Sequence, residues 1–161
     1  MVLTGSGVVF TAGLDFDHHF PLFASRSLKE IDAWFDAYRA TNLRLFTYPR
    51  PTVAAINGHA YAGGLITALD CDHRIAAEGS LQFSLNEVPI GIPMPAVYCE
   101  IIKHAVGPRS AFELTQQSTM RLALIEIGCA VITVERRPDA GILASYQPTS
   151  TENLIRRAVA K

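Results

Sequence analysis

The feature that most constrains this chain is an apolar run followed at once by small residues. Residues 52–56 (TVAAI) carry no charge, which is typical of a strand covered on both faces. Asn57-Gly58 predicts a turn, and Gly63-Gly64 opens a short helix. Small residues allow close approach to the backbone, and the first amides of a helix have no partner inside it. The segment therefore favours an anion or oxyanion site, with tight helix packing as the alternative.

Shorter patterns suggest further strands and helices around this segment. Strands are predicted at residues 2–4, 74–76 and 81–84, and residues 8–24 are interpreted as a loop. Apolar residues recur at helical spacing from Leu28 to Leu45, and Pro49 and Pro51 end that helix. Pro95 and Pro108 suit the first turns of two more helices, with Gly107 ending the first of them.

Strands and helices also alternate in the last part of the chain. A helix is predicted at 122–127, a strand at 130–134, and a final helix after the capping-box pattern of residues 149–152. Alternating strands and helices indicate an α/β fold. We expect one domain over residues 1–161, with a core at 1–135 and a C-terminal helical segment at 136–161.

Composition excludes several classes of protein. The chain has 161 residues, of which 49% are apolar, and its net charge is −1, so it is expected to form a globule with neither nucleic acid nor membrane as a partner. Cys71, Cys99 and Cys129 fit no zinc or redox spacing and are interpreted as core thiols in a reducing compartment. The sequence contains no signal-peptide pattern, so we expect a cytoplasmic protein, or an organellar one if a further N-terminal region precedes it.

Two groups of polar residues resemble metal ligands at first sight. Residues 10–16 (FTAGLDF) offer backbone amides after a strand, and Asp15, Asp17, His18 and His19 lie in or beside them. The sequence contains no second cluster of ligands at zinc-like spacing that could complete a site with them. These residues are therefore interpreted as a polar surface loop, and no metal is expected. Residues 70–73 (DCDH), with Asp70, Asp72 and His73, are interpreted in the same way.

One acidic residue lies in an otherwise apolar stretch. Glu87 occupies the centre of residues 85–91 (LNEVPIG). Apolar surroundings favour the neutral form of a carboxyl and can make it a proton shuttle. From the local sequence alone, an exposed loop glutamate is the alternative.

Taken together, these segments resemble the crotonase (enoyl-CoA hydratase/isomerase) superfamily in order and separation. The matching stretches are residues 2–16, 49–77 and 81–93, and more loosely 104–115 and 123–135. The resemblance implies a crotonase-like spiral of ββα units that binds an acyl-CoA thioester, with no cofactor besides the coenzyme A of the substrate. It also implies a homo-oligomer, either a trimer or a hexamer.

The resemblance assigns roles to particular residues. The backbone amides of Leu14 and Gly63 would form the oxyanion hole, and Glu87 would be the catalytic carboxylate. Ala12, Asp15 and Phe16 would lie near coenzyme A, and Tyr61 and Ala62 along the thioester channel. Hydratases of the superfamily carry a second glutamate three residues after the oxyanion glycine, where this chain has Ile66. We expect Ile66 to be an apolar wall of the acyl pocket.

The single glutamate makes the chain most similar to mitochondrial-type Δ3,Δ2-enoyl-CoA isomerases, enzymes of fatty acid metabolism. An enoyl-CoA hydratase and a shortened acyl-CoA-binding protein without activity are the alternatives. Relatives carry a strand–helix–strand region before the strand at residues 2–4, and more helices after Val134. The fold is therefore expected to be incomplete at the N-terminus and compressed at the C-terminus.

Overall fold

The computed structural model describes residues 1–117 and 129–132. Its strands are β1 (Val2–Thr4), β2 (Val9–Thr11), β3 (Val53–Ile56), β4 (His59–Tyr61), β5 (His73–Ala77), β6 (Phe83–Ser84) and β7 (Cys129–Ile132). Its helices are α1 (Phe16–Ser25), α2 (Leu28–Phe46), α3 (Gly63–Leu69), the 3₁₀ helix η1 (Val88–Ile90), α4 (Ala96–Val106) and α5 (Pro108–Gln117). The predicted helices at 122–127 and after residue 149 lie outside the described residues.

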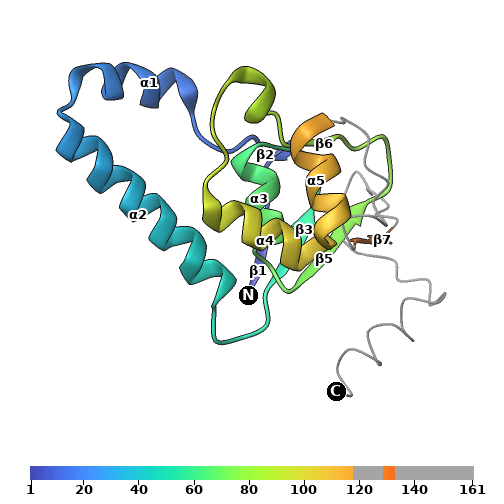
Figure 1. The fold of residues 1–161 in the computed structure, drawn as a ribbon. Helices are drawn as coiled ribbons and strands as arrows, with labels where there is room; N and C mark the ends of the chain where they lie inside the picture. Colours follow the sequence, from blue (N-terminus) through green and yellow to red (C-terminus); the bar gives the residue numbers. More distant parts are fainter. Residues whose placement is uncertain (118–128, 133–161) are drawn as a thin grey trace.

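Successive strands alternate between two parallel sheets (Figure 1). One sheet has the order β1-β3-β5-β7 and the other the order β2-β4-β6, and every pair in both is parallel. The chain therefore adds one strand to each sheet and then a helical segment before it repeats the pattern. The expected α/β fold of ββα units is confirmed.

Asn57 joins two successive corners of the chain, the one between β1 and β2 and the one between β3 and β4. Its carboxamide oxygen accepts a hydrogen bond from the backbone of Gly5 at 2.8 Å, and its amide donates to the carbonyl of Gly7 at 3.1 Å. A Cβ on Gly58 would overlap the carbonyl of Val8, so only glycine fits between the two corners. Asn57-Gly58 forms the predicted turn and also fixes the position of the preceding corner.

The hydrophobic core lies between the sheets and helices α3, α4 and α5. α3 contributes Leu65, Ile66, Ala68 and Leu69 to it. Strands β3 and β6 supply Ile56 and Phe83, and helices α4 and α5 supply Ile101, Ile102 and Leu114. Of the three cysteines, Cys71 is buried as predicted, Cys99 is partly buried, and the side chain of Cys129 lies outside the described residues.

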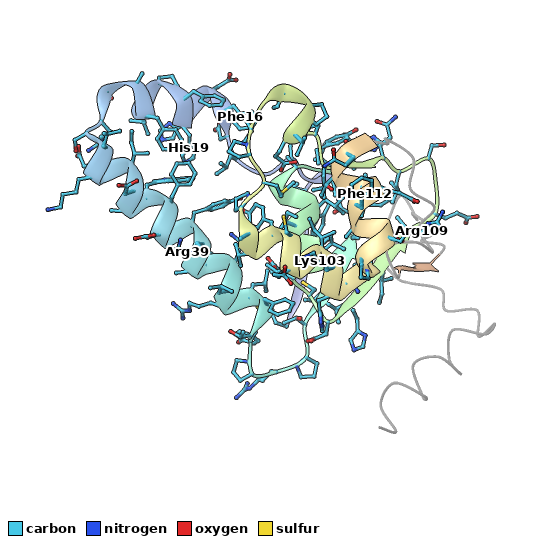
Figure 2. The ribbon with its side chains drawn as sticks, in the orientation of Figure 1. Phe16, His19, Arg39, Lys103, Arg109 and Phe112 are labelled. Atoms are coloured by element: carbon cyan, nitrogen blue, oxygen red, sulfur yellow. The ribbon has the colours of Figure 1, made fainter. Side chains whose placement is uncertain are left out.

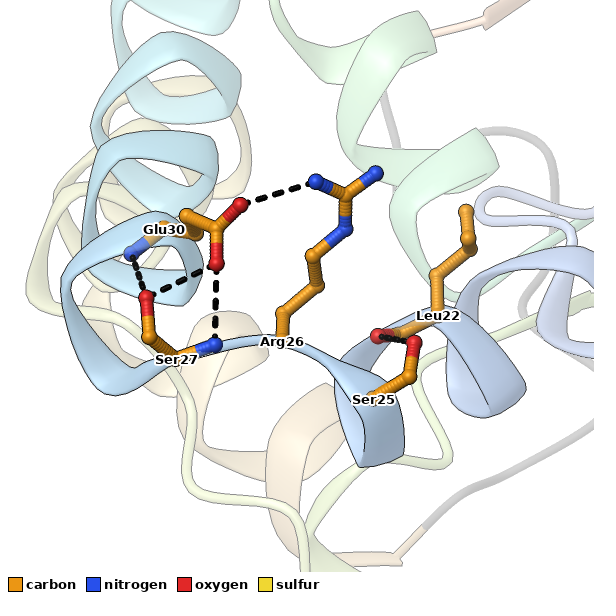
Figure 3. Close-up of polar contacts among 5 residues, drawn as sticks. All are labelled: Leu22, Ser25, Arg26, Ser27 and Glu30. Atoms are coloured by element: carbon orange, nitrogen blue, oxygen red, sulfur yellow. Dashed lines mark hydrogen bonds and ion pairs between the residues drawn. The ribbon is translucent and has the colours of Figure 1, made fainter.

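Helices α1 and α2 extend to one side of this core (Figure 1). The corner between them is held by a capping box, in which Ser27 and Glu30 each bind the backbone of the other (Figure 3). Arg26 adds an ion pair to Glu30 at 2.8 Å (Figure 3). The hydrogen bonds from Ser27 and Arg26 lower the pKa of Glu30 to about 2, so the Glu30 carboxylate stays ionised.

The interpretation of residues 8–24 as a loop is wrong. Residues 9–11 form β2, and α1 begins at Phe16 with Asp15 as its N-cap, whose carboxylate accepts from the amide of His18 at 3.1 Å. The sequence also gave no sign of β4, a strand of three residues. The other predicted strands and helices within the described residues are confirmed within one or two residues of their ends.

The aspartates of residues 70–73 have structural roles, and the interpretation of Asp70 as a surface residue is wrong. Asp72 links the starts of β3 and β5, because one of its carboxylate oxygens accepts from both the amide and the hydroxyl of Thr52, at 2.8 and 2.9 Å. Asp70 is only 3% exposed, and neither of its oxygens has a hydrogen-bond partner. Burial raises the pKa of Asp70 to about 7.

These two carboxyls predict opposite effects of pH on stability. An unfolded aspartate has a pKa near 3.9, so between about pH 4 and pH 7 the folded protein holds a proton on Asp70 that the unfolded chain has released. The contribution of Asp70 to the free energy of unfolding therefore falls, by on the order of 4 kcal/mol, as the pH rises through that window. We expect Asp70→Asn to flatten this slope in denaturant titrations at several pH values.

Asp72→Asn is the matched control for that experiment. In the unmodified protein, hydrogen bonds from Thr52 lower the pKa of Asp72. The contribution of Asp72 to the free energy of unfolding is therefore present above the unfolded pKa and is lost only as the pH falls through the folded pKa. The Asp72 variant should therefore keep the slope between about pH 4 and pH 7. An unchanged slope in the Asp70 variant would contradict the assignment.

Candidate active site

The candidate site lies where the carboxyl ends of β2, β4 and β6 meet. Leu14, Gly63 and Glu87 each follow the last residue of their strand by two or three positions. The parallel registers pair Thr11 with Ala60 and Tyr61 with Ser84, so the three segments leave the sheet side by side. Ligands commonly bind at this edge of a parallel sheet. The fold thus gathers three residues that are far apart in the sequence.

The loop after β2 packs directly on the N-terminus of α3. A Cβ on Gly13, which has φ +85°, would lie 2.9 Å from the amide nitrogen of Gly63. A Cβ on Gly64 would overlap the carbonyl of Thr11. Both contacts require glycine, because no larger residue leaves room for the two backbones. The close approach brings the amide of Leu14, next to Gly13, to the first amide of α3.

The Leu14 and Gly63 amides are available to a ligand. Within residues 1–117 and 129–132, neither donates a hydrogen bond to the protein. Ala62, the residue before Gly63, is the N-cap of α3 and has φ 50° and ψ −132°, the single positive φ among the described non-glycine residues. Its own amide donates to Ser84 at 2.8 Å, which holds this strained residue in place. The geometry suits an oxyanion.

A cavity of about 410 Å³ opens beside these amides. Its walls come from α1, α2, the N-terminus of α3 and the segment from Glu87 to α4, and they are mainly apolar and aromatic. They comprise Leu14, Phe16, His19, Phe20, Phe23, Phe35, Tyr38, Ala62, Gly63, Glu87, Ile92, Pro93, Met94, Pro95 and Tyr98. Figure 2 shows Phe16 and His19 on α1, above α2 and beside the core. Glu87 is the single carboxylic acid among these described wall residues.

Glu87 has the environment of a proton-transfer group. It precedes η1, is 9% exposed, and its Oε2 atom is buried without a hydrogen-bond partner. Burial is the main cause that raises its pKa above the ordinary glutamate value, opposed by a backbone hydrogen bond. The alternative of an exposed loop glutamate is therefore excluded. A base whose pKa is raised toward neutrality takes up a proton more readily than an ordinary carboxylate.

The other residues named from the sequence are placed differently. Phe16 and Ala62 line the cavity, whereas Ala12 and Asp15 are exposed in the loop that carries Leu14. Tyr61 donates to Gln82 at 2.6 Å and contributes no surface to the cavity.

Ile66 also differs from its expected position. It lies one turn into α3, is fully buried in the hydrophobic core, and is not among the residues that line the cavity. An acidic side chain at this position would be surrounded by core residues.

Sequence reasoning missed the cavity's other polar groups. Tyr38 comes from α2, Tyr98 from α4 and His19 from α1. His19 is held by its Nδ1 atom, which lies 2.8 Å from the carbonyl of Asp15. The tyrosines occur at positions of helical apolar spacing, where a core role was the natural interpretation. Their hydroxyl groups become visible as site residues only when the two helices are brought together.

Two expected absences concern only the described part of the chain. Residues 1–117 and 129–132 contain no group of three or more histidine, cysteine or acidic residues that could hold a metal ion. No helix within those ranges has the length and hydropathy that crossing a bilayer requires.

Comparison with known proteins identifies the family. A family model described as enoyl-CoA hydratase/isomerase matches residues 1–123. A putative enoyl-CoA hydratase from Thermus thermophilus is 37% identical over 119 residues, which are 71% of this chain and 44% of that protein. The human mitochondrial enoyl-CoA delta isomerase 1 is 35% identical over 104 residues, which are 64% of this chain and 33% of that protein. The chain belongs to the enoyl-CoA hydratase/isomerase family.

The fold agrees with this assignment. The crystal structure of an enoyl-CoA hydratase/carnithine racemase from Magnetospirillum magneticum superposes with a TM-score of 0.70 at 26% identity, over 81% of this chain and 50% of that one. The predicted crotonase-like fold is thus confirmed. The chain spans less than half the length of the two relatives named above.

The backbone contact at Gly64 predicts a sharp effect of adding one methyl group. In Gly64→Ala the Cβ must separate α3 from the Thr11 carbonyl, which moves the Gly63 amide away from Leu14. We expect a loss of stability of about 1–3 kcal/mol, as for other overpacked sites. Thermal melting measures the effect.

Ala62→Gly provides the neighbouring control. It places glycine where the backbone already has a positive φ, so it relieves strain while the contact of Gly64 is left intact. This variant should melt at least as high as the unmodified protein. If Gly64→Ala were equally well tolerated, the tight contact between the β2 loop and α3 would be disproved.

Proposed function

We propose that this chain is an enoyl-CoA isomerase that shifts the double bond of a 3-enoyl-CoA to give the 2-trans-enoyl-CoA. The observation that carries the proposal is that Glu87 is the one carboxyl among the described residues lining an apolar cavity, which also contains the unpartnered amides of Leu14 and Gly63. Double-bond migration needs one group that removes a proton and returns it elsewhere. Water addition needs more polar groups to hold and activate the water.

The amides would bind the thioester carbonyl of the substrate. Ionised Glu87 would take a proton from C2, and the electrons released would delocalise onto the thioester oxygen. Backbone N–H groups that are in position before the reaction stabilise such a charge without reorganisation. Protonated Glu87 would then deliver the proton to C4, which moves the double bond and restores the carboxylate.

The cavity walls support an acyl thioester as the substrate. Phenylalanine side chains of α1 and α2 line the cavity together with Met94 and three neighbouring residues, and these surfaces suit an aliphatic chain better than a polar one. The exposed loop with Ala12 and Asp15 lies outside the cavity, beside Leu14, where the coenzyme A part of the substrate would extend. No further cofactor enters the proposal.

An enoyl-CoA hydratase is the second candidate, favoured by the name of the Thermus relative. The two activities are separated by their substrates. An isomerase converts 3-hexenoyl-CoA into the conjugated enoyl-CoA, which gains ultraviolet absorbance. A hydratase consumes the absorbance of crotonyl-CoA. Activity toward neither substrate, together with thioester binding, would identify a binding protein without activity.

Glu87→Gln tests the proposed base. The substitution keeps the shape of the side chain but removes its ability to accept a proton, so we expect the rate of 3-hexenoyl-CoA isomerisation to fall by about 10²–10⁴-fold. The affinity for coenzyme A should remain nearly unchanged. Glu100→Gln, on the exposed surface of α4, is the matched control and should keep full activity. Near-normal turnover in the Glu87 variant would remove this residue from the mechanism.

The pH dependence of the reaction follows from the burial of Glu87. Proton abstraction requires the ionised form, and burial raises the pKa of this carboxyl. The value of kcat/KM should therefore rise with pH and level off only above the ordinary glutamate range near 4.5. A profile that is flat from about pH 4.5 upward would show that an exposed carboxylate, or no carboxylate, limits the rate.

A further inference from the structure

Tyr38 brings a third polar group to the oxyanion site. It lies on α2, and its side chain lines the cavity together with Leu14, Gly63 and Glu87. A Cβ on Gly63 would lie 2.6 Å from the Tyr38 hydroxyl oxygen. The hydroxyl therefore contacts the α-carbon that carries one of the two oxyanion amides. Nothing in the reaction as described above uses it.

The hydrogen bonds around Tyr38 determine the direction of its proton. The Nδ2 atom of Asn42 donates to the backbone carbonyl of Tyr38 at 2.8 Å, and makes a longer contact of 3.5 Å with the hydroxyl of Tyr98. An amide nitrogen donates and does not accept. Tyr98 therefore accepts from Asn42, and its own proton is directed to Tyr38, with which its hydroxyl is hydrogen-bonded. Tyr38 in turn has its proton left for a group in the cavity.

Packing holds the Tyr38 ring in one orientation. Trp34 stacks on it with a centroid distance of 5.3 Å and an interplanar angle of 21°. Tyr98 packs on it edge to face, at 6.1 Å and 75°. Asn42 and Tyr98 are both buried. The hydroxyl is thus positioned before a ligand binds, which is the condition under which a donor stabilises a developing charge most effectively.

We propose that the Tyr38 hydroxyl is a third hydrogen-bond donor to the thioester oxygen, beside the amides of Leu14 and Gly63. The proposal rests on the proposed function, since the charged species it binds is the enolate of an acyl-CoA. Tyr38 donates a hydrogen bond and keeps its proton throughout, so Glu87 remains the group that transfers protons. Tyr38 is a catalytic residue in this scheme and Tyr98 a positioning residue.

Binding of an enolate without turnover is the most direct test. Acetoacetyl-CoA forms an enolate that absorbs in the near ultraviolet, so the fraction bound as enolate to the full chain can be measured in a titration. Tyr38→Phe removes only the hydroxyl. We expect it to weaken enolate binding and to lower kcat with 3-hexenoyl-CoA, each by roughly tenfold to 100-fold, because two backbone donors remain.

Three measurements separate this role from a merely structural one. The affinity for coenzyme A and the melting temperature of Tyr38→Phe should match those of the unmodified protein. Tyr48→Phe, at an exposed tyrosine, should change nothing. Tyr98→Phe should lower enolate binding less than Tyr38→Phe does, because Tyr38 can still donate when the hydroxyl of Tyr98 that positions it is removed. A larger loss in the Tyr98 variant would make Tyr98 the donor and overturn the proposal.

Failure of this proposal is distinguishable from failure of the proposed function. If the unmodified protein binds the enolate and isomerises 3-hexenoyl-CoA, while Tyr38→Phe does both equally well, the third donor is disproved and the isomerase stands. If the unmodified protein binds the enolate and Tyr38→Phe weakens that binding, but no isomerisation occurs, the third donor stands and the isomerase is disproved. Absence of enolate binding by the unmodified protein overturns both.

Discussion

The close packing of two backbone segments is the constraint on which the rest of this structure depends. The loop after β2 lies against the first turn of α3, and Gly13 and Gly64 are the residues whose side chains would prevent it. The contact is possible only because β2 and β4 are parallel neighbours in the same sheet. It fixes the Leu14 amide relative to that of Gly63, and so creates a pair of donors that neither segment contains alone.

The same sheet supplies the carboxyl. Because β6 is the next neighbour of β4, the chain that leaves β6 passes the N-terminus of α3 and carries Glu87 with it. The hydrogen bond from the Ala62 amide to the Ser84 carbonyl links these two exits directly, and Glu87, the N-cap of η1, follows Ser84 by three residues. The Leu14 and Gly63 amides and the Glu87 carboxyl are therefore held by neighbouring strands of one small sheet. Substitutions that loosen this sheet should displace the two amides and the carboxyl together, because the same three strands position all of them.

The sequence predicted the parts of this arrangement that depend on local chemistry. Residues 52–56, the turn at Asn57-Gly58 and the start of α3 follow from an apolar run, a turn dipeptide and paired glycines. The family resemblance then located Leu14, Gly63 and Glu87, which local patterns alone left ambiguous. The structure adds the physical reason, since the strand registers bring these three residues to one edge.

The errors share a different cause. Residues 8–24 are interpreted as a loop because they mix glycine, aspartate, histidine and phenylalanine. The helix within them, α1, contains Pro21 and has no buried residue, so it lacks the usual pattern of a helix packed on a core. Its signal was present in Asp15 as an N-cap, followed by Phe16, Phe20 and Phe23 at helical spacing. The helix is held by ring contacts such as that of Phe23 with Trp34, at 5.0 Å, and these cannot be read from a sequence. Tyr38 and Tyr98 were missed for the same reason, because their contact joins residues that are distant in the chain.

Asp70 and Glu87 show why burial alone does not identify a functional carboxyl. Both are buried, both have oxygen atoms without hydrogen-bond partners, and burial raises the pKa of both. Burial is the main cause that raises the pKa of Tyr98, followed by its hydrogen bond with Tyr38. The negative charges of Asp70 and Glu87 raise it further. They differ in access, since Glu87 lines the cavity whereas Asp70 ends α3 inside the protein. A carboxyl that no ligand reaches can influence only stability, whereas one that shares a cavity with two free amides can exchange a proton with whatever those amides hold.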